Sequence, residues 1–116
     1  MKKIEFDTMT DSRGNDNFEA YLATLTEKEQ DKLVARILEI EHQGLQVARR
    51  MKWVKKLDDD LYEIRCQFSN NIQRVLYFQE KDNKFVITHG FSKKTQKTPA
   101  REISKARRMR NKYLGR

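Results

Sequence analysis

Residues 61–79 read LYEIRCQFSNNIQRVLYFQ, and this stretch decides the fold. Apolar and polar side chains alternate over 61–68, which is the pattern of a strand with one apolar and one polar face. The expected apolar face carries Tyr62, Ile64, Cys66 and Phe68, and the expected polar face carries Glu63, Arg65 and Gln67. Ser69-Asn70-Asn71 predicts a hairpin turn, after which 72–79 forms a second strand. The stretch therefore predicts an antiparallel pair of strands.

Downstream of this pair, residues 80–84 predict another turn and Phe85–Phe91 a third strand. Thr98 and Pro99 are typical of a helix start, with the threonine as cap and the proline at the first helical position. This last helix can dock through Ile103, Ala106, Met109 and Tyr113, while its other faces are basic.

Upstream, residues 3–6 form a short extended run, and residues 11–17 are typical of a loop. Residues 18–25 predict a short helix. Thr26 and Glu29 then match a capping box, which predicts a longer helix that runs to about Gln43 and stops at Gly44. Together these segments predict a helical hairpin.

The expected fold class is therefore α+β: an antiparallel sheet with an N-terminal helical hairpin and a C-terminal helix, in one domain over 1–116. Residues 52–57, which include Trp53 and Val54, have strand character. They form either a further strand or only an approach to the next one.

Positive charge is concentrated at the C-terminal end. The chain has a net charge of +8, and residues 92–116 alone hold ten Lys or Arg and a single acid, Glu102. The other 91 residues are almost neutral, with 15 basic and 16 acidic side chains. A one-signed block on a neutral domain favours a polyanion partner such as RNA, DNA or an acidic protein. A solvated helix is the plainer alternative.

Several classes of protein do not fit this sequence. His42 and His89 are far apart and no Cys/His cluster exists, so no metal site is expected. The four glycines are scattered, which argues against a phosphate loop and a nucleotide cofactor. Asp58-Asp59-Asp60 is most simply a solvated turn, and the single cysteine, Cys66, a small buried side chain.

No long apolar run exists, so no membrane segment is expected. The residues that follow Met1 contain no apolar region of the kind found in signal peptides, which predicts a cytoplasmic protein.

The chemistry that remains is cationic. Arg65 and Arg74 lie on adjacent strands and can share one sheet face, and Lys93 and Lys94 follow the third strand. Such a set can bind an RNA backbone and stabilise the charge that develops when the 2′-OH attacks the neighbouring phosphate.

Each candidate also has a structural interpretation. Arg65 can equally form an ion pair with Glu63, and the lysines can belong to a solvated loop. A proton shuttle is also required, and either His89 or a lysine with a depressed pKa could serve; a single histidine in a strand is more often structural.

Four segments together resemble a known family: LDDDLYEIR at 57–65, RVLYF at 74–78, HGFSKKTQKTP at 89–99, and Glu102-Ile103 followed by Ala106. In order and spacing they are similar to the phage-derived Gp49-like branch of the RelE/ParE toxin superfamily, to which HigB toxins belong. The resemblance is good over residues 52–114, and the helical hairpin matches only in shape.

This resemblance implies a RelE-like fold and a toxin that cuts mRNA in the ribosomal A site without metal or cofactor, an mRNA interferase. By position it assigns Arg65 and Lys94 to transition-state charge, and Arg74 and Lys93 to the substrate phosphate. Further nucleic-acid contacts are expected from Lys55, Lys56, Lys97 and Arg101. No tyrosine stands where the best-known RelE pattern has one, so the general base is left open.

The resemblance also implies an antitoxin partner with a helix-turn-helix domain, similar to HigA, in a toxin–antitoxin hetero-oligomer. Three alternatives remain at this point. The chain can be a ParE-like inhibitor of DNA gyrase, a non-catalytic nucleic-acid-binding module, or a toxin that no longer acts.

Overall fold

Five strands form one sheet, in the order β1-β5-β4-β3-β2, in the computed structural model, which describes residues 1–116. The strands are β1 (Glu5–Thr8), β2 (Val54–Asp58), β3 (Leu61–Phe68), β4 (Asn71–Lys81) and β5 (Lys84–Lys93). β1 runs parallel to β5, and every other neighbouring pair is antiparallel. The predicted α+β class is confirmed, with one parallel pair at the edge of the sheet.

The structure settles the strand boundaries. The segment with strand character before Asp58 is a true edge strand, because β2 pairs with β3. β4 and β5 are longer than predicted, so the expected turn over 80–84 is too wide: the strands continue to Lys81 and restart at Lys84. Asp82 can make this tight connection because its backbone is left-handed, with φ of 49°. Lys93 belongs to β5 and does not follow it.

The helical hairpin is confirmed and contains one more helix than predicted. α1 (Asn17–Ala23) leads to α2 (Glu27–Gln43), where Thr26 and Glu29 form the predicted capping box. Gly44 ends α2 with φ of 88°. A six-residue helix, α3 (Leu45–Arg50), then follows where only a connection was expected; its burial rests mainly on Ala48.

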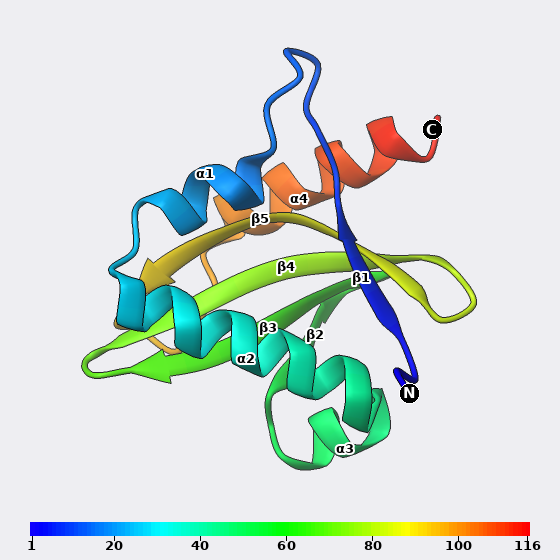
Figure 1. The fold of residues 1–116 in the computed structure, drawn as a ribbon. Helices are drawn as coiled ribbons and strands as arrows, with labels where there is room; N and C mark the ends of the chain where they lie inside the picture. Colours follow the sequence, from blue (N-terminus) through cyan, green and yellow to red (C-terminus); the bar gives the residue numbers. More distant parts are fainter.

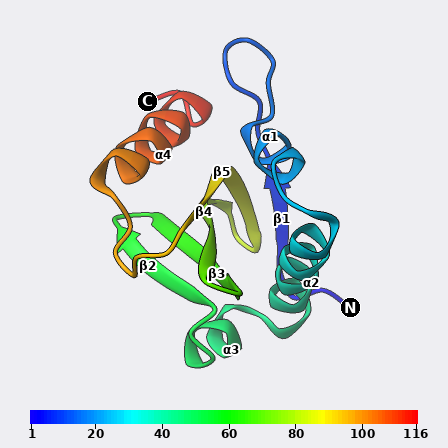
Figure 2. The same cartoon turned by 90° about the vertical axis from the view of Figure 1, so that its left-hand side faces the viewer.

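Helices cover both faces of the sheet (Figures 1 and 2). α1, α2 and α3 lie on one face, and α4 (Ala100–Tyr113) lies alone on the other. The larger core lies under α1–α3 and includes Leu33, Ile40, Ile64, Cys66 and Tyr77. The smaller core lies under α4, where Ala106 packs with strand residues such as Leu76 and Phe78. Glu63, Arg65 and Gln67 therefore share one face, as the alternation predicted, and it is the face that α4 covers.

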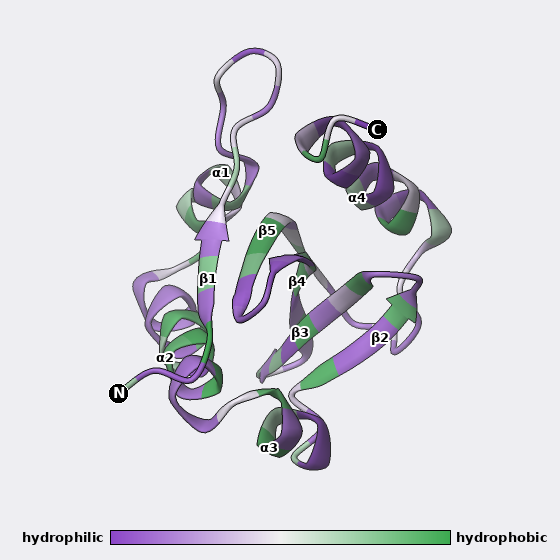
Figure 3. Ribbon diagram, turned by 90° about the vertical axis from the view of Figure 1, so that its right-hand side faces the viewer, coloured by the Kyte–Doolittle hydropathy of each residue, from purple (hydrophilic) through white to green (hydrophobic).

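α4 starts differently from the prediction. Thr98 is not its cap: Pro99 is the N-cap residue and the helix begins at Ala100. The helix is mostly hydrophilic (Figure 3), and its basic side chains help to hold it. Arg107 forms an ion pair with Asp58, and Arg110 donates to the Asp59 carbonyl at 2.8 Å. The acidic turn is therefore a docking point for α4 rather than a simply solvated turn.

Two leucines of α2 test which face of the helix packs on the sheet. Leu33 is fully buried and Leu38 is 44% exposed. We expect Leu33→Ala to lower the free energy of unfolding by about 2–5 kcal/mol, because it leaves a core cavity. Leu38→Ala, the matched control, should change it by about 0.5 kcal/mol or less. Urea denaturation of both variants checks this orientation, and equal losses would contradict it.

Candidate phosphodiester site on the sheet

Two arginines lie side by side on the sheet face that α4 covers. The backbone register places Arg65 directly opposite Arg74, and Arg74 opposite Phe91. The next row along the same face holds Glu63, Leu76 and His89. Side chains in directly opposed positions of a sheet point to the same face. The structure therefore brings the two predicted arginines together, with a carboxylate beside them.

Arg65 is held from two sides. Its Nε donates to Oε1 of Glu63 at 2.6 Å, which is the ion pair that the sequence left as an alternative. Its Nη2 donates to the carbonyl of Gln96, and its Nη1 lies 3.4 Å from the Gln96 side-chain oxygen. The side chain keeps 19% of its surface exposed, so its outer edge still reaches solvent.

Arg74 is completely buried, which the sequence did not predict. Its Nη1 donates to the Thr98 hydroxyl at 3.3 Å, and its guanidinium lies over the Phe91 ring. Its Nε and Nη2 have no hydrogen-bond partner. Burial lowers the pKa of Arg74, Arg65 lowers it further, and Glu63 opposes both. An arginine stays protonated even so. A buried cation with two unpartnered donor nitrogens is a place where an anion can bind.

Glu63 links the two arginines. Its carboxylate is fully buried, and while Oε1 accepts from Arg65, Oε2 accepts from the hydroxyl of Thr98. Thr98 thus connects Glu63 with Arg74. One carboxylate beside two guanidinium groups leaves the cluster with a net charge of +1.

The connection between β5 and the N-cap of α4, residues 94–98, covers this cluster through the contacts of Gln96 and Thr98 with the two arginines. Lys93 is half-buried at the end of β5, and the register with Ile72 places it on the same face as Arg74. Lys94 and Lys97 are exposed on the connection itself, on either side of Gln96. Lys93 therefore shares the face of the arginine pair, and Lys94 and Lys97 flank the Gln96 that Arg65 contacts, while the three ammonium groups make no ion pair or hydrogen bond within the protein.

His89 lies on the same face but is buried. Its Nε2 and Oε1 of Glu102 are 3.0 Å apart, and its Nδ1 is 3.0 Å from the Thr88 hydroxyl. A carboxylate only accepts, so Nε2 carries the hydrogen. Burial lowers the pKa of His89, more than the bond to Glu102 raises it. With both nitrogens engaged and 2% of its surface exposed, His89 has the surroundings of a structural residue.

The remaining predicted cations are dispersed. Lys55 pairs with Glu63 in register and so faces the arginine cluster, whereas Lys56 pairs with Tyr62 and faces the other side of the sheet. Arg101 lies in the first turn of α4, 74% exposed and 3.6 Å from Glu102. Lys55, Lys97 and Arg101 can therefore extend the cationic surface, and Lys56 cannot reach the same ligand from its strand position.

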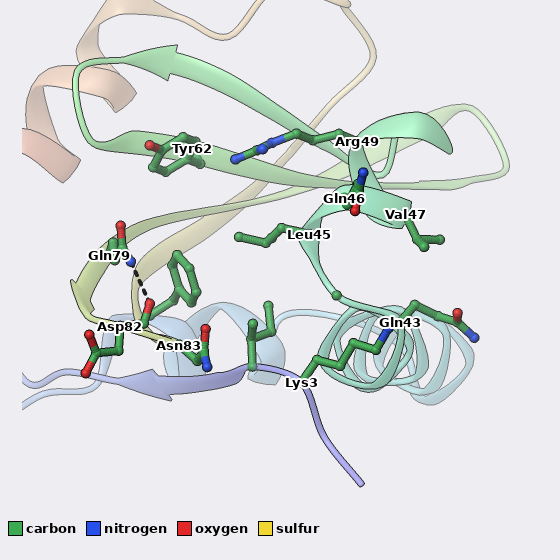
Figure 4. A pocket seen from close by; sticks show the side chains of 13 residues that line it. Lys3, Gln43, Leu45, Gln46, Val47, Arg49, Tyr62, Gln79, Asp82 and Asn83 are labelled. Atoms are coloured by element: carbon green, nitrogen blue, oxygen red, sulfur yellow. Dashed lines mark hydrogen bonds between the residues drawn. The ribbon is translucent and has the colours of Figure 1, made fainter.

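The largest cavity lies on the opposite face of the sheet. It has a volume of about 430 Å³ and is lined by residues of α3, of the β4–β5 turn and of the N-terminal segment (Figure 4). Arg49 and Tyr62 lie on one side of it and Lys3 on the other. None of the arginine cluster lines it, so it is separate from the cationic site.

Three further observations concern metal ligands, membrane spans and the single cysteine. Nowhere do three His, Cys, Asp or Glu side chains gather closely enough to hold a metal ion. No helix has the length and apolar character needed to cross a membrane. Cys66 is buried under α2, and burial raises the pKa of its thiol, as expected for a packing residue.

Sequence reasoning missed three residues of the site: Glu63 as a shared partner, Gln96 and Thr98. The alternation placed Glu63 on the correct face, but only the tertiary structure shows that one carboxylate serves two elements. Thr98 looked like a helix cap because it precedes a proline. No local pattern could have revealed that its hydroxyl turns back toward the sheet.

His89 makes stability depend on pH. Its folded-state pKa lies below the ordinary value of 6.5, so the unfolded chain binds this proton more tightly. The contribution of neutral His89 is complete above about pH 6.5 and is lost as the pH falls through the lowered pKa. We expect the free energy of unfolding to fall less steeply between about pH 7 and 5 in His89→Gln than in the wild type. Urea denaturation over this range measures it.

The matched control for this prediction is the exposed His42. His42→Gln should keep the wild-type pH dependence. If it flattened the curve as much as His89→Gln does, the pH dependence could not be assigned to His89.

Comparison with known proteins agrees with the predicted family. Residues 20–111 match the model of the family described as Phage derived protein Gp49-like (DUF891). The match includes most of the helical hairpin, for which the sequence had shown similarity only in shape. No curated protein is similar enough in sequence to count as a match. The chain therefore belongs to the phage-derived Gp49-like family, a branch of the RelE/ParE toxin superfamily.

Proposed function

We propose that the chain is the toxin of a type II toxin–antitoxin system and inhibits translation by cutting mRNA on the ribosome. Family membership supports a RelE-like toxin. The observation that carries the specific activity is the pair of opposed arginines with a single carboxylate and two unpartnered guanidinium nitrogens. A phosphodiester supplies one negative charge and several acceptor oxygens, which is what this cluster lacks.

The reaction proposed is transesterification within the RNA. The 2′-oxygen attacks the adjacent phosphorus, the bond to the 5′-oxygen breaks, and a 2′,3′-cyclic phosphate and a 5′-hydroxyl result. Negative charge grows on the non-bridging oxygens, where preorganised cations lower the barrier. RNA brings its own nucleophile, so the protein needs only to supply charge, orientation and proton transfer, and no metal ion is required.

Roles follow from position and exposure. Arg65 and Lys94, both of which reach solvent, stabilise the transition state. Lys93 and Arg74 are assigned to the substrate phosphate, Arg74 through the charge of its guanidinium beneath the connection at 94–98. The lysines are better placed than the buried His89 to transfer protons. Lys55, Lys97 and Arg101 extend contact along the RNA backbone, where binding weakens with salt.

The family implies an antitoxin partner. We propose that this partner carries a helix-turn-helix domain and meets the toxin through an acidic surface, in a hetero-oligomer. The support is electrostatic: the chain carries +8, and opposite potentials favour association.

Arg65 tests the proposed activity. Arg65→Ala should slow cleavage of a labelled mRNA on programmed ribosomes by about 100-fold or more, because one transition-state cation is removed. Arg65→Lys should recover only part of the rate, since an ammonium lacks the planar fork. Arg50→Ala, on an exposed arginine at the end of α3, is the matched control and should keep the wild-type rate.

A gyrase supercoiling assay on the same proteins tests the alternative activity. Inhibition of gyrase without mRNA cleavage would replace the nuclease proposal with a ParE-like activity. Growth arrest by a folded Arg65→Ala protein as strong as that of the wild type would point to a non-catalytic module.

A further inference from the structure

Glu63 is the only member of the arginine cluster that carries negative charge, and it is fully buried. We propose that Glu63 is a positioning residue for the cleavage reaction, and that it acts through Arg65 and through the Thr98 hydroxyl. The inference rests on the proposed function. Because the carboxylate is covered, it touches no substrate and is not itself catalytic.

Glu63 first fixes the plane of the Arg65 guanidinium. The Nε–Oε1 distance of 2.6 Å is that of a charge-assisted hydrogen bond. A guanidinium has five N–H groups, and here Nε is committed to Glu63 while Nη1 and Nη2 each point one N–H toward Gln96. Two N–H groups have no partner within the protein. Their direction is set by the bond at Nε, so a phosphate meets donors that are already oriented.

Glu63 also fixes the connection that carries the lysines. The hydroxyl of Thr98 has one hydrogen, which it donates to Oε2 of Glu63, and its oxygen accepts from Nη1 of Arg74 at 3.3 Å. Both directions of the hydroxyl are thus in use. The end of the 94–98 connection is therefore tied to strand β3 through one carboxylate.

The two oxygens of the Glu63 carboxylate consequently have different partners and different roles. Oε1 orients the cation on the strand, and Oε2 holds the connection on which Lys94 and Lys97 stand. A single group thereby sets the position of the strand cation relative to the loop cations. A phosphodiester that bridges them requires this relation to be correct to within about 0.5 Å.

Glu63→Gln tests this with an almost unchanged shape. The amide keeps one acceptor for Arg65 but offers Thr98 a donor in place of an acceptor, and it removes the only negative charge. We expect the single-turnover cleavage rate to fall about 100-fold while the mRNA concentration for half-maximal rate changes by less than about threefold. Thr98→Val should lose about tenfold, and Thr98→Ser, which keeps the hydroxyl, should stay close to wild type.

Glu41→Gln is the matched control for a lost buried carboxylate. Glu41 is 4% exposed, accepts from the Phe6 amide and pairs with Lys2, far from the cationic site. The Glu41→Gln variant should have a lower free energy of unfolding, but its folded fraction should keep the wild-type cleavage rate. Equal rate losses in Glu41→Gln and Glu63→Gln would reduce Glu63 to a stability residue and overturn the proposal.

A double-mutant cycle asks whether Glu63 acts through Arg65. In an Arg65→Ala background, Glu63→Gln should cost no more than the roughly tenfold expected of Thr98→Val, because Arg65 is gone and only the bond that holds the connection is left to lose. A further loss of about 100-fold in that background would mean that the two residues act independently, which contradicts the proposal.

An NMR measurement separates this inference from the proposed function. The Nε–H resonance of Arg65 should be slow to exchange in the wild type and in Thr98→Ser. In Glu63→Gln, where a neutral amide oxygen replaces the carboxylate, it should exchange measurably faster with the backbone amides unchanged. Should wild-type protein cut no mRNA, the proposed function fails, while this resonance still reports whether Glu63 orients Arg65. Unchanged exchange in Glu63→Gln overturns the positioning role by itself.

Discussion

One buried carboxylate, that of Glu63, is the constraint on which both the site and the position of α4 depend. Two guanidinium groups and one carboxylate are withdrawn from water, which costs several kcal/mol per ion unless good geometry and additional hydrogen bonds compensate. Thr98 supplies part of this compensation. Because Thr98 stands two residues before Ala100, where α4 begins, the same hydrogen bonds that satisfy the charges also fix the start of the helix.

The far end of α4 is fixed by the same kind of interaction. Arg107 and Arg110 dock on the acidic turn between β2 and β3, and Tyr113 donates to Glu80. The apolar seam under the helix is small, so charge replaces part of the usual hydrophobic attachment. The basic side chains of residues 92–116 therefore have two roles. Some of them hold α4 on the sheet, and those next to the arginine cluster stay free for a polyanion.

The sequence predicted the sheet well because its signal is local. Alternation over 61–68 fixed which face carries Arg65, and the short turn before β4 brought Arg74 opposite to it. The burial of Arg74 could not be predicted, since it depends on a connection more than 20 residues away that folds back over the strand. For the same reason Thr98 was interpreted as a cap. α3 was not predicted because six residues give too little periodicity to distinguish a helix from a connection.

Arg74 keeps two buried nitrogens without a hydrogen-bond partner. A folded protein rarely leaves a buried donor without an acceptor, and where it does, the cost is often linked to function. In this chain the cost falls on a cation that lies under a connection of five residues, four of them exposed polar or basic side chains. In the proposed reaction, an anion bound beside this connection meets the net positive charge of the cluster. Because negative charge grows on the non-bridging oxygens during the proposed cleavage, this positive charge stabilises the transition state more than the bound substrate, and only such a difference raises the rate.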